Sequence, residues 1–278
     1  MTTTAADTST AAGRDSARPV YKVTFAGVIR SEWGKFWSVR STWITLALAV
    51  VMVLAFGIIA AAVFTPGESR GNGPDVSEGA VGLATTGTTF AELALGVLGV
   101  MIAASEYTTG MIRATLSAVP TRLPVLWSKS LVLGSAILPL ACATALGSFW
   151  VGGLVLKDTE MAQSISDPGV LRVLIGVGLY LTLVGVWGVA LGSLLRSTAG
   201  GIAVLVSVLL IVPGLTGLLP SSIRDDVTPY LPNESGQAVT HLHQASDSLG
   251  PWAGLAVFAG WVALTLAGAA YRLAKTDA

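Results

Sequence analysis

Long apolar stretches separated by short polar segments run through most of this chain of 278 residues. A hydrocarbon layer about 30 Å thick is crossed by roughly 20 helical residues, and six stretches reach that length. Because a backbone in lipid must satisfy its own hydrogen bonds, each stretch is predicted to be a helix, which makes the protein an all-α, polytopic membrane protein. The six transmembrane helices are predicted at residues 43–64, 88–104, 131–156, 173–195, 201–219 and 252–270.

The first 20 residues differ from the rest because Thr, Ala, Ser and Asp replace the apolar runs. They lack the apolar core of a cleavable signal peptide, so residues 1–20 are predicted to be a disordered cytoplasmic tail. Residues 21–278 are predicted to form one six-span membrane domain, in which the first span is an uncleaved anchor.

Composition supports a chain in lipid and excludes a water-soluble globule. Hydrophobic residues make up 53% of the chain, and charged residues make up 12%, which is about half the usual fraction. The formal net charge is zero, so nothing indicates a nucleic-acid partner. The one cysteine, Cys142, excludes an internal disulfide and is predicted to be a small packing residue.

The placement of Lys and Arg predicts the orientation, because cytoplasmic loops carry an excess of both. An even number of spans puts both termini on one side of the membrane. On that side lie Arg14, Arg18, Lys22, Arg30, Lys35, Arg40, Arg113, Arg122, Lys129, Arg196, Arg272 and Lys275. On the other side lie only Arg70, Lys157, Arg172 and Arg224. Both termini are therefore predicted to be cytoplasmic.

The segment before the first span is predicted to be an amphipathic helix lying in the membrane interface. Arg30, Ser31 and Lys35 occupy its polar face. The apolar face, at helical spacings of three and four, consists of Phe25, Val28, Ile29, Trp33, Phe36 and Trp37. Such a helix either anchors the chain to the lipid bilayer alone or also contacts a cytoplasmic partner.

The loop between the second and third spans is 26 residues long, from Ser105 to Ser130. A short helix is predicted at residues 105–118, capped by Ser105 or Thr108, and Pro120 and Pro124 then turn the chain back. A helix held between two spans can transmit a force to both of them. The alternative is a turn that only connects two helices.

The loop sequence SEYTTGMIRATLSAVPTRLPVLWSKSLV resembles that of bacterial ABC transporter permeases of the type-2 exporter class. The segments IRSEWGKFWSVRSTW, ALGSLLRSTAGGIAV and PYLPNESGQAV resemble its actinobacterial branch, in the same order. The resemblance runs from about residue 24 to the C-terminus. It implies a permease in the bacterial plasma membrane, paired as a homodimer or with a second permease subunit. It further implies that two separate ATP-binding subunits bind ATP and Mg and drive export.

In that family the loop helix is a coupling helix that docks on the ATP-binding subunit. The resemblance therefore implies contact positions at Glu106, Tyr107, Thr108, Gly110, Ile112 and Arg113. It also implies that the second and fifth spans line the substrate path, and their apolar character favours a hydrophobic or amphipathic cargo.

This chain itself is predicted not to be an enzyme and to hold no cofactor. A phosphate-binding loop is absent, because Gly34 and Lys35 are followed by Phe36 instead of Ser or Thr. The one ionisable side chain expected within a span, Glu92, is predicted to reach interfacial water near the outer end. The alternative function is a membrane-embedded binding or immunity protein that works without an ATPase partner.

Three further patterns are weaker. His241 and His243 in segment 220–251 allow a metal site, but their spacing favours an outer loop, and no metal site is predicted. The G-x-x-x-G sequences that begin at Gly188 and Gly250 favour ordinary helix packing over a dimer seam. Prolines within two spans, Pro139 and Pro213, predict kinks.

Overall fold

The computed structural model describes residues 23–64, 78–119, 121–159, 161–244 and 248–275, and the regular elements in these ranges are all helical. Six helical segments are long and apolar enough to cross a membrane, as the sequence predicts. They are Arg40–Val63 (α2), Gly79–Thr108 (α3, Gly79–Thr85, and α4, Thr88–Thr108), Leu123–Leu156 (α6), Val170–Leu195 (α7), Thr198–Thr216 (α8, Thr198–Val206; η2, Ser207–Ile211; α9, Val212–Thr216) and Pro251–Lys275 (α12).

The predicted span at 131–156 is longer in the structure, because α6 begins at Leu123. Pro124 lies in its first turn, where backbone N–H groups have no acceptor within the helix, so the missing N–H of proline costs no hydrogen bond. The polar residues Ser128, Lys129 and Ser130 are therefore helical and buried. The prediction that they belong to a connecting loop is wrong.

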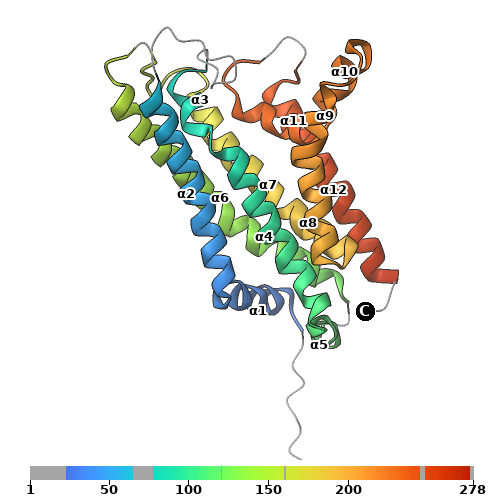
Figure 1. Ribbon diagram of the computed structural model, residues 1–278. Helices are drawn as coiled ribbons and strands as arrows, with labels where there is room; N and C mark the ends of the chain where they lie inside the picture. The colour runs from blue at the N-terminus through green and yellow to red at the C-terminus, as the bar shows by residue number, and fades with distance from the viewer. Residues whose placement is uncertain (1–22, 65–77, 120, 160, 245–247, 276–278) are drawn as a thin grey trace, which may run out of the picture.

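Helix α7 is the centre of the bundle and packs against α4, α6, α8 and α12 (Figure 1). Its contact with α4 depends on glycine, because a Cβ atom at Gly188 would lie 2.1 Å from the carbonyl oxygen of Gly96. A Cβ atom at Gly192 would lie 2.7 Å from the carbonyl oxygen of Val100. The G-x-x-x-G sequence of this span therefore serves helix packing inside one chain, as predicted.

Two sets of short helices mark the two ends of the bundle (Figure 1). At one end lie α1 (Phe25–Ser38), α5 (Met111–Ala118) and the end of α12. At the other end lie α10 (Ser221–Val227), η3 (Thr228–Tyr230), α11 (Pro232–Gln237) and η4 (Ala238–Thr240). The start of α1 and the last turn of α12 thus share one end.

The span in which Pro213 predicts a kink contains a π-helical turn, η2, just before the proline. The backbone N–H of Val212 donates to the carbonyl of Ser207, five residues earlier. Proline has no N–H to donate, which disturbs the regular hydrogen-bond ladder of the preceding turn. Pro139 lies inside α6, which is helical on both sides of this proline.

Candidate functional site

Helix α1 forms where the sequence predicts it, capped by the side chain of Thr24, which accepts a hydrogen bond from the N–H of Gly27 at 3.2 Å. Its faces differ from the prediction. Val28, Glu32 and Phe36 are buried against the bundle, whereas Phe25 and Trp33 are 46% and 42% exposed. Val28 and Phe36, which the sequence places on the apolar face of the helix, therefore pack inside the chain.

Aromatic rings join α1 to α2 at the remaining apolar surface. The ring centroids of Trp33 and Trp37 are 5.7 Å apart, and those of Trp37 and Trp43 are 4.6 Å apart. The indole N–H of Trp43 donates to the carbonyl of Trp37 at 3.1 Å. Ile29 and Trp37 are half-buried. The position of this helix in a membrane interface stays a prediction.

The loop helix begins later than expected, because α4 continues to Thr108 and α5 starts only at Met111. Gly110 separates them with a φ of 74°, a left-handed conformation that favours glycine. Ser105 caps no helix, since it lies inside α4, where its carbonyl accepts from the hydroxyls of Thr108 and Thr109. Pro120 lies outside the described residues.

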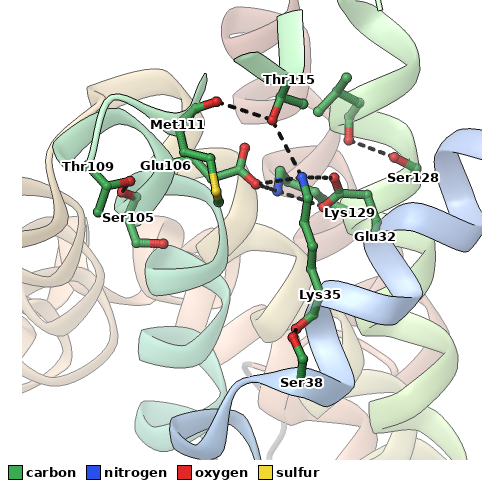
Figure 2. Close-up of polar contacts among 11 residues, drawn as sticks. Glu32, Lys35, Ser38, Ser105, Glu106, Thr109, Met111, Thr115, Ser128 and Lys129 are labelled. Atoms are coloured by element: carbon green, nitrogen blue, oxygen red, sulfur yellow. Dashed lines mark hydrogen bonds and ion pairs between the residues drawn. The ribbon is translucent and has the colours of Figure 1, made fainter. Parts of the chain in front are cut away.

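Four charged side chains from three helices meet beneath α5 and form what we name the charge cluster: Glu32, Lys35, Glu106 and Lys129 (Figure 2). Lys129 Nζ lies 2.7 Å from Glu32 Oε2 and 2.7 Å from Glu106 Oε1. Lys35 Nζ lies 2.6 Å from Glu32 Oε1 and 3.0 Å from the same Glu106 Oε1. The cluster therefore ties α1 to both α4 and α6.

The cluster is deeply buried and electrically balanced. The side chains of Glu32, Glu106 and Lys129 are 5%, 3% and 5% exposed, and that of Lys35 is 33% exposed. Burial lowers the pKa of Lys35, but the hydrogen bond and charge of Glu32 and the charge of Glu106 outweigh it and raise the pKa overall. Removal of one buried partner would leave an uncompensated charge, which is strongly destabilising.

Across α5, Thr115 on its inner side places Oγ1 3.5 Å from Lys35 Nζ, and Ile112 is 6% exposed. Both therefore contact the protein interior. The opposite side carries Arg113, Ala114 and Ser117, which are exposed. The short helix thus has one face fixed to the bundle and one face open.

The six positions implied as partner contacts fall into two groups. Thr108, Gly110 and Arg113 are exposed, and half-buried Tyr107 lies under the guanidinium of Arg196, 5.3 Å from its ring centroid. The other two, Glu106 and Ile112, are buried inside the chain. Glu106 faces the interior of this chain, where its carboxylate pairs with Lys35 and Lys129, and its contact with an ATP-binding subunit stays a prediction. Sequence reasoning did not single out Glu32 or Lys129.

A second buried polar cluster lies nearer the other end of the bundle. The hydroxyl of Tyr180 on α7 lies 2.5 Å from a carboxylate oxygen of Glu92 on α4 and 3.1 Å from Asn233 Oδ1 on α11. Gln237 Nε2 donates to Asn233 Oδ1 at 2.9 Å. Glu92 is 1% exposed, so the expectation that it reaches interfacial water is wrong.

The segment after α9 is folded onto the bundle. Glu78 accepts hydrogen bonds from the backbone N–H groups of Leu242 and His243, the latter at 3.0 Å. A cavity of about 560 Å³ there is lined by Glu78, Glu234, His241 and His243, among others. Within the described ranges, no group of three or more His, Cys, Asp or Glu residues is placed to hold a metal ion.

No protein-family model matches the chain, and no curated protein matches it. The likeness to type-2 exporter permeases therefore rests on the sequence segments quoted above. What the structure adds, over the residues that it describes, is an all-helical fold with six helices long and apolar enough to span a membrane and a charge cluster beneath a short, half-open helix.

Proposed function

We propose that this chain is the membrane-spanning permease subunit of an ATP-driven ABC exporter, paired with a second permease and driven by separate ATP-binding subunits. The observation that carries the proposal is the attachment of α5. This helix follows α4 after the two residues Thr109 and Gly110, precedes α6 closely, and rests on the charge cluster that holds α1. A force on its open face would reach three elements at once.

The physical basis is the rigidity of the connection. A flexible loop would absorb a displacement, whereas a helix that packs on a buried ion-pair network moves with it. Helix α5 contacts this network through Thr115, whose Oγ1 accepts a hydrogen bond from Lys35 Nζ at 3.5 Å. Lys35 is paired with Glu106 of α4 at 3.0 Å, and Glu106 is paired with Lys129 of α6 at 2.7 Å, so a displacement of α5 would pass through Lys35 to both spans. In this scheme Glu106 and Ile112 act inside the permease, and Thr108, Gly110 and Arg113 remain as the positions that contact the ATP-binding subunit.

The charge distribution supports a cytoplasmic position for α1, α5 and the end of α12, because cytoplasmic segments are rich in Lys and Arg. Within the described ranges, the cations at this end are Arg30, Lys35, Arg40, Arg113, Arg122, Lys129, Arg196, Arg272 and Lys275. We therefore propose a bacterial plasma membrane protein with both termini in the cytoplasm.

The span from α8 to α9 is the least buried of the six. Leu210, Ile211 and Leu215 on this span are each at least half exposed. An apolar face of this kind suits either lipid or a second permease copy. We propose that the second permease copy pairs across this span and that the cargo path is hydrophobic or amphipathic.

The test is capture of the partner from native membranes. A photo-crosslinking amino acid at position 113 of the full chain should form an adduct with a polypeptide that contains a phosphate-binding loop. The matched control is position 167, which is exposed at the opposite end and should form no such adduct. Absence of an ATP-binding polypeptide from the position-113 adducts would overturn the proposal and favour a binding protein without turnover.

A functional measurement separates coupling from folding. Arg113→Ala should lower transport-stimulated ATP hydrolysis by about ten- to hundredfold, because a docked helix loses a charge-assisted contact. The thermal stability of the purified chain should not change, since Arg113 is exposed. Thr121→Ala, also exposed, is the control and should leave ATP hydrolysis unchanged. Equal hydrolysis in both variants would contradict a coupling role for α5.

A further inference from the structure

A cavity of about 200 Å³ lies between α1, α2, α4 and α6 and opens beside the charge cluster. One end is polar and includes Glu106 and Lys129, whereas the remaining wall includes the apolar side chains of Phe36, Leu98 and Ile102. An apolar wall with a few converging polar groups is the usual construction of a small-molecule site. Met111 of α5 also lines it, so the residues come from five helices of a single chain.

The second observation is an unpaired buried oxygen. Glu106 Oε1 accepts from both Lys35 and Lys129, but Glu106 Oε2 has no hydrogen-bond donor among the described residues. Figure 2 shows the dashed lines converging on one carboxylate oxygen of Glu106 while the other has none. A buried carboxylate oxygen strongly favours a donor, because water no longer solvates it. Glu106 is one of the residues that line the cavity, and Oε2 is the oxygen of its carboxylate that is still without a donor.

The charge balance selects the kind of donor. The two lysines already neutralise the two glutamates, so an additional cation at Oε2 would stand close to Lys35 and Lys129 and be repelled. A neutral hydroxyl donates a hydrogen bond without adding charge. The volume lies below the roughly 300–1,000 Å³ of drug-sized pockets, which leaves room for a hydroxyl and a short length of alkyl chain.

We propose that this cavity binds a neutral, hydroxyl-bearing amphiphile from the bilayer. Its hydroxyl donates to Glu106 Oε2, and its alkyl chain lies along Leu98 and Ile102. The ligand would occupy the space between α1 and the end of α4. This inference uses only contacts within one chain, so it stands apart from the exporter proposal.

The experiment uses the full chain in phosphatidylcholine nanodiscs and a diazirine-bearing octanol as photolabel. Labelled residues, mapped by mass spectrometry, should cluster at Met101, Ile102 and Met111, which line the cavity. Excess 1-octanol should protect these positions at least tenfold better than a methyl ether of the same length, which accepts but does not donate. Equal protection by the two competitors would show that no ligand hydroxyl donates a hydrogen bond to Glu106 Oε2 and would overturn the proposal.

Two variants sharpen the result. Ile102→Trp fills the apolar part without touching the four charges and should lower labelling at Met101 about tenfold, whereas the size-matched Ile102→Leu should not. Glu106→Gln presents an amide that can donate to an ether oxygen, so the preference for the alcohol should disappear. Labelling that persists in Ile102→Trp overturns the proposal. If that variant does not fold, the competitor series on the unmodified chain still decides.

Discussion

Lys129 on α6 and Glu32 on α1 are 97 positions apart in the chain, and their charged groups meet at 2.7 Å with both side chains 5% exposed. This ion pair joins the first helix to the third spanning segment. Two buried charges repay their desolvation only when each has a partner in good geometry. The pair therefore stabilises the position of α1 only if Lys35 and Glu106 supply the remaining opposite charges of the cluster.

Lys129→Met should destabilise the chain by roughly 3–5 kcal/mol, because Glu32 and Glu106 would share the single cation Lys35. The measurement is thermal unfolding of the purified protein in detergent. Adding Glu106→Gln should recover part of the loss, with a coupling energy of about 0.5–3 kcal/mol.

The control for this double-mutant cycle is Arg113→Met, at an exposed position where roughly 0.5 kcal/mol or less is expected. A loss in Lys129→Met as small as in the control would mean that the charge cluster does not form in the folded chain.

The raised pKa of Lys35 predicts a loss of stability at alkaline pH. A lysine whose pKa rises on folding contributes stability that is fully present below its ordinary value of 10.5 and is lost as pH rises through the folded value. Glu32 and Glu106 face this ammonium, and Lys129 lies beside it. The difference in melting temperature between the unmodified chain and Lys35→Met should therefore shrink above about pH 10.5. A constant difference across that range would contradict the assignment.

The glycine contact between α4 and α7 predicts a sharp effect of one methyl group. Gly188→Ala places a Cβ atom 2.1 Å from the carbonyl oxygen of Gly96, so the helices must separate. Overpacking of this kind costs about 1–3 kcal/mol. Gly153→Ala in α6 is the matched control, because no atom lies within 4 Å of its Cβ position, and it should be neutral or slightly stabilising. Similar melting temperatures for the two variants would argue against this packing.

The second polar cluster predicts a specific role for one hydroxyl. Tyr180→Phe removes the hydrogen bond to buried Glu92 and should cost about 1–3 kcal/mol. Tyr230→Phe is the control, since Tyr230 is 54% exposed. The two substitutions remove the same atom, so differential scanning fluorimetry compares the sites directly. Equal shifts would mean that Glu92 does not depend on Tyr180.

The spans could be predicted because lipid thickness sets the length of an apolar helix, and this signal is local. The start of α6 was missed for a related reason. Ser128, Lys129 and Ser130 are polar, so the sequence predicts a loop at these positions. No neighbouring residue indicates that Lys129 will be buried and neutralised by Glu32 and Glu106.

The site was predictable only in outline. The length and prolines of the 105–130 loop indicated a short helix, and α5 is present. The start at Met111 follows from the left-handed conformation of Gly110, which the sequence allowed but did not require. The burial of Glu106 depends on Lys129, 23 positions away, and on Lys35, 71 positions away. No short stretch of the sequence contains all of these residues, so a local pattern could not predict the burial of Glu106.

The sequence by itself determined that this protein is helical, that six segments can cross a membrane, and that a further helix precedes the first of them. These properties follow from apolar length and periodicity, which each segment carries alone. Only the tertiary structure decided that Glu32 and Glu106 face inward and that Glu92 lies against Tyr180. The physical reason is that a charge or polar group is buried only where partners from distant segments compensate its lost hydration, and the packing of the helices selects those partners.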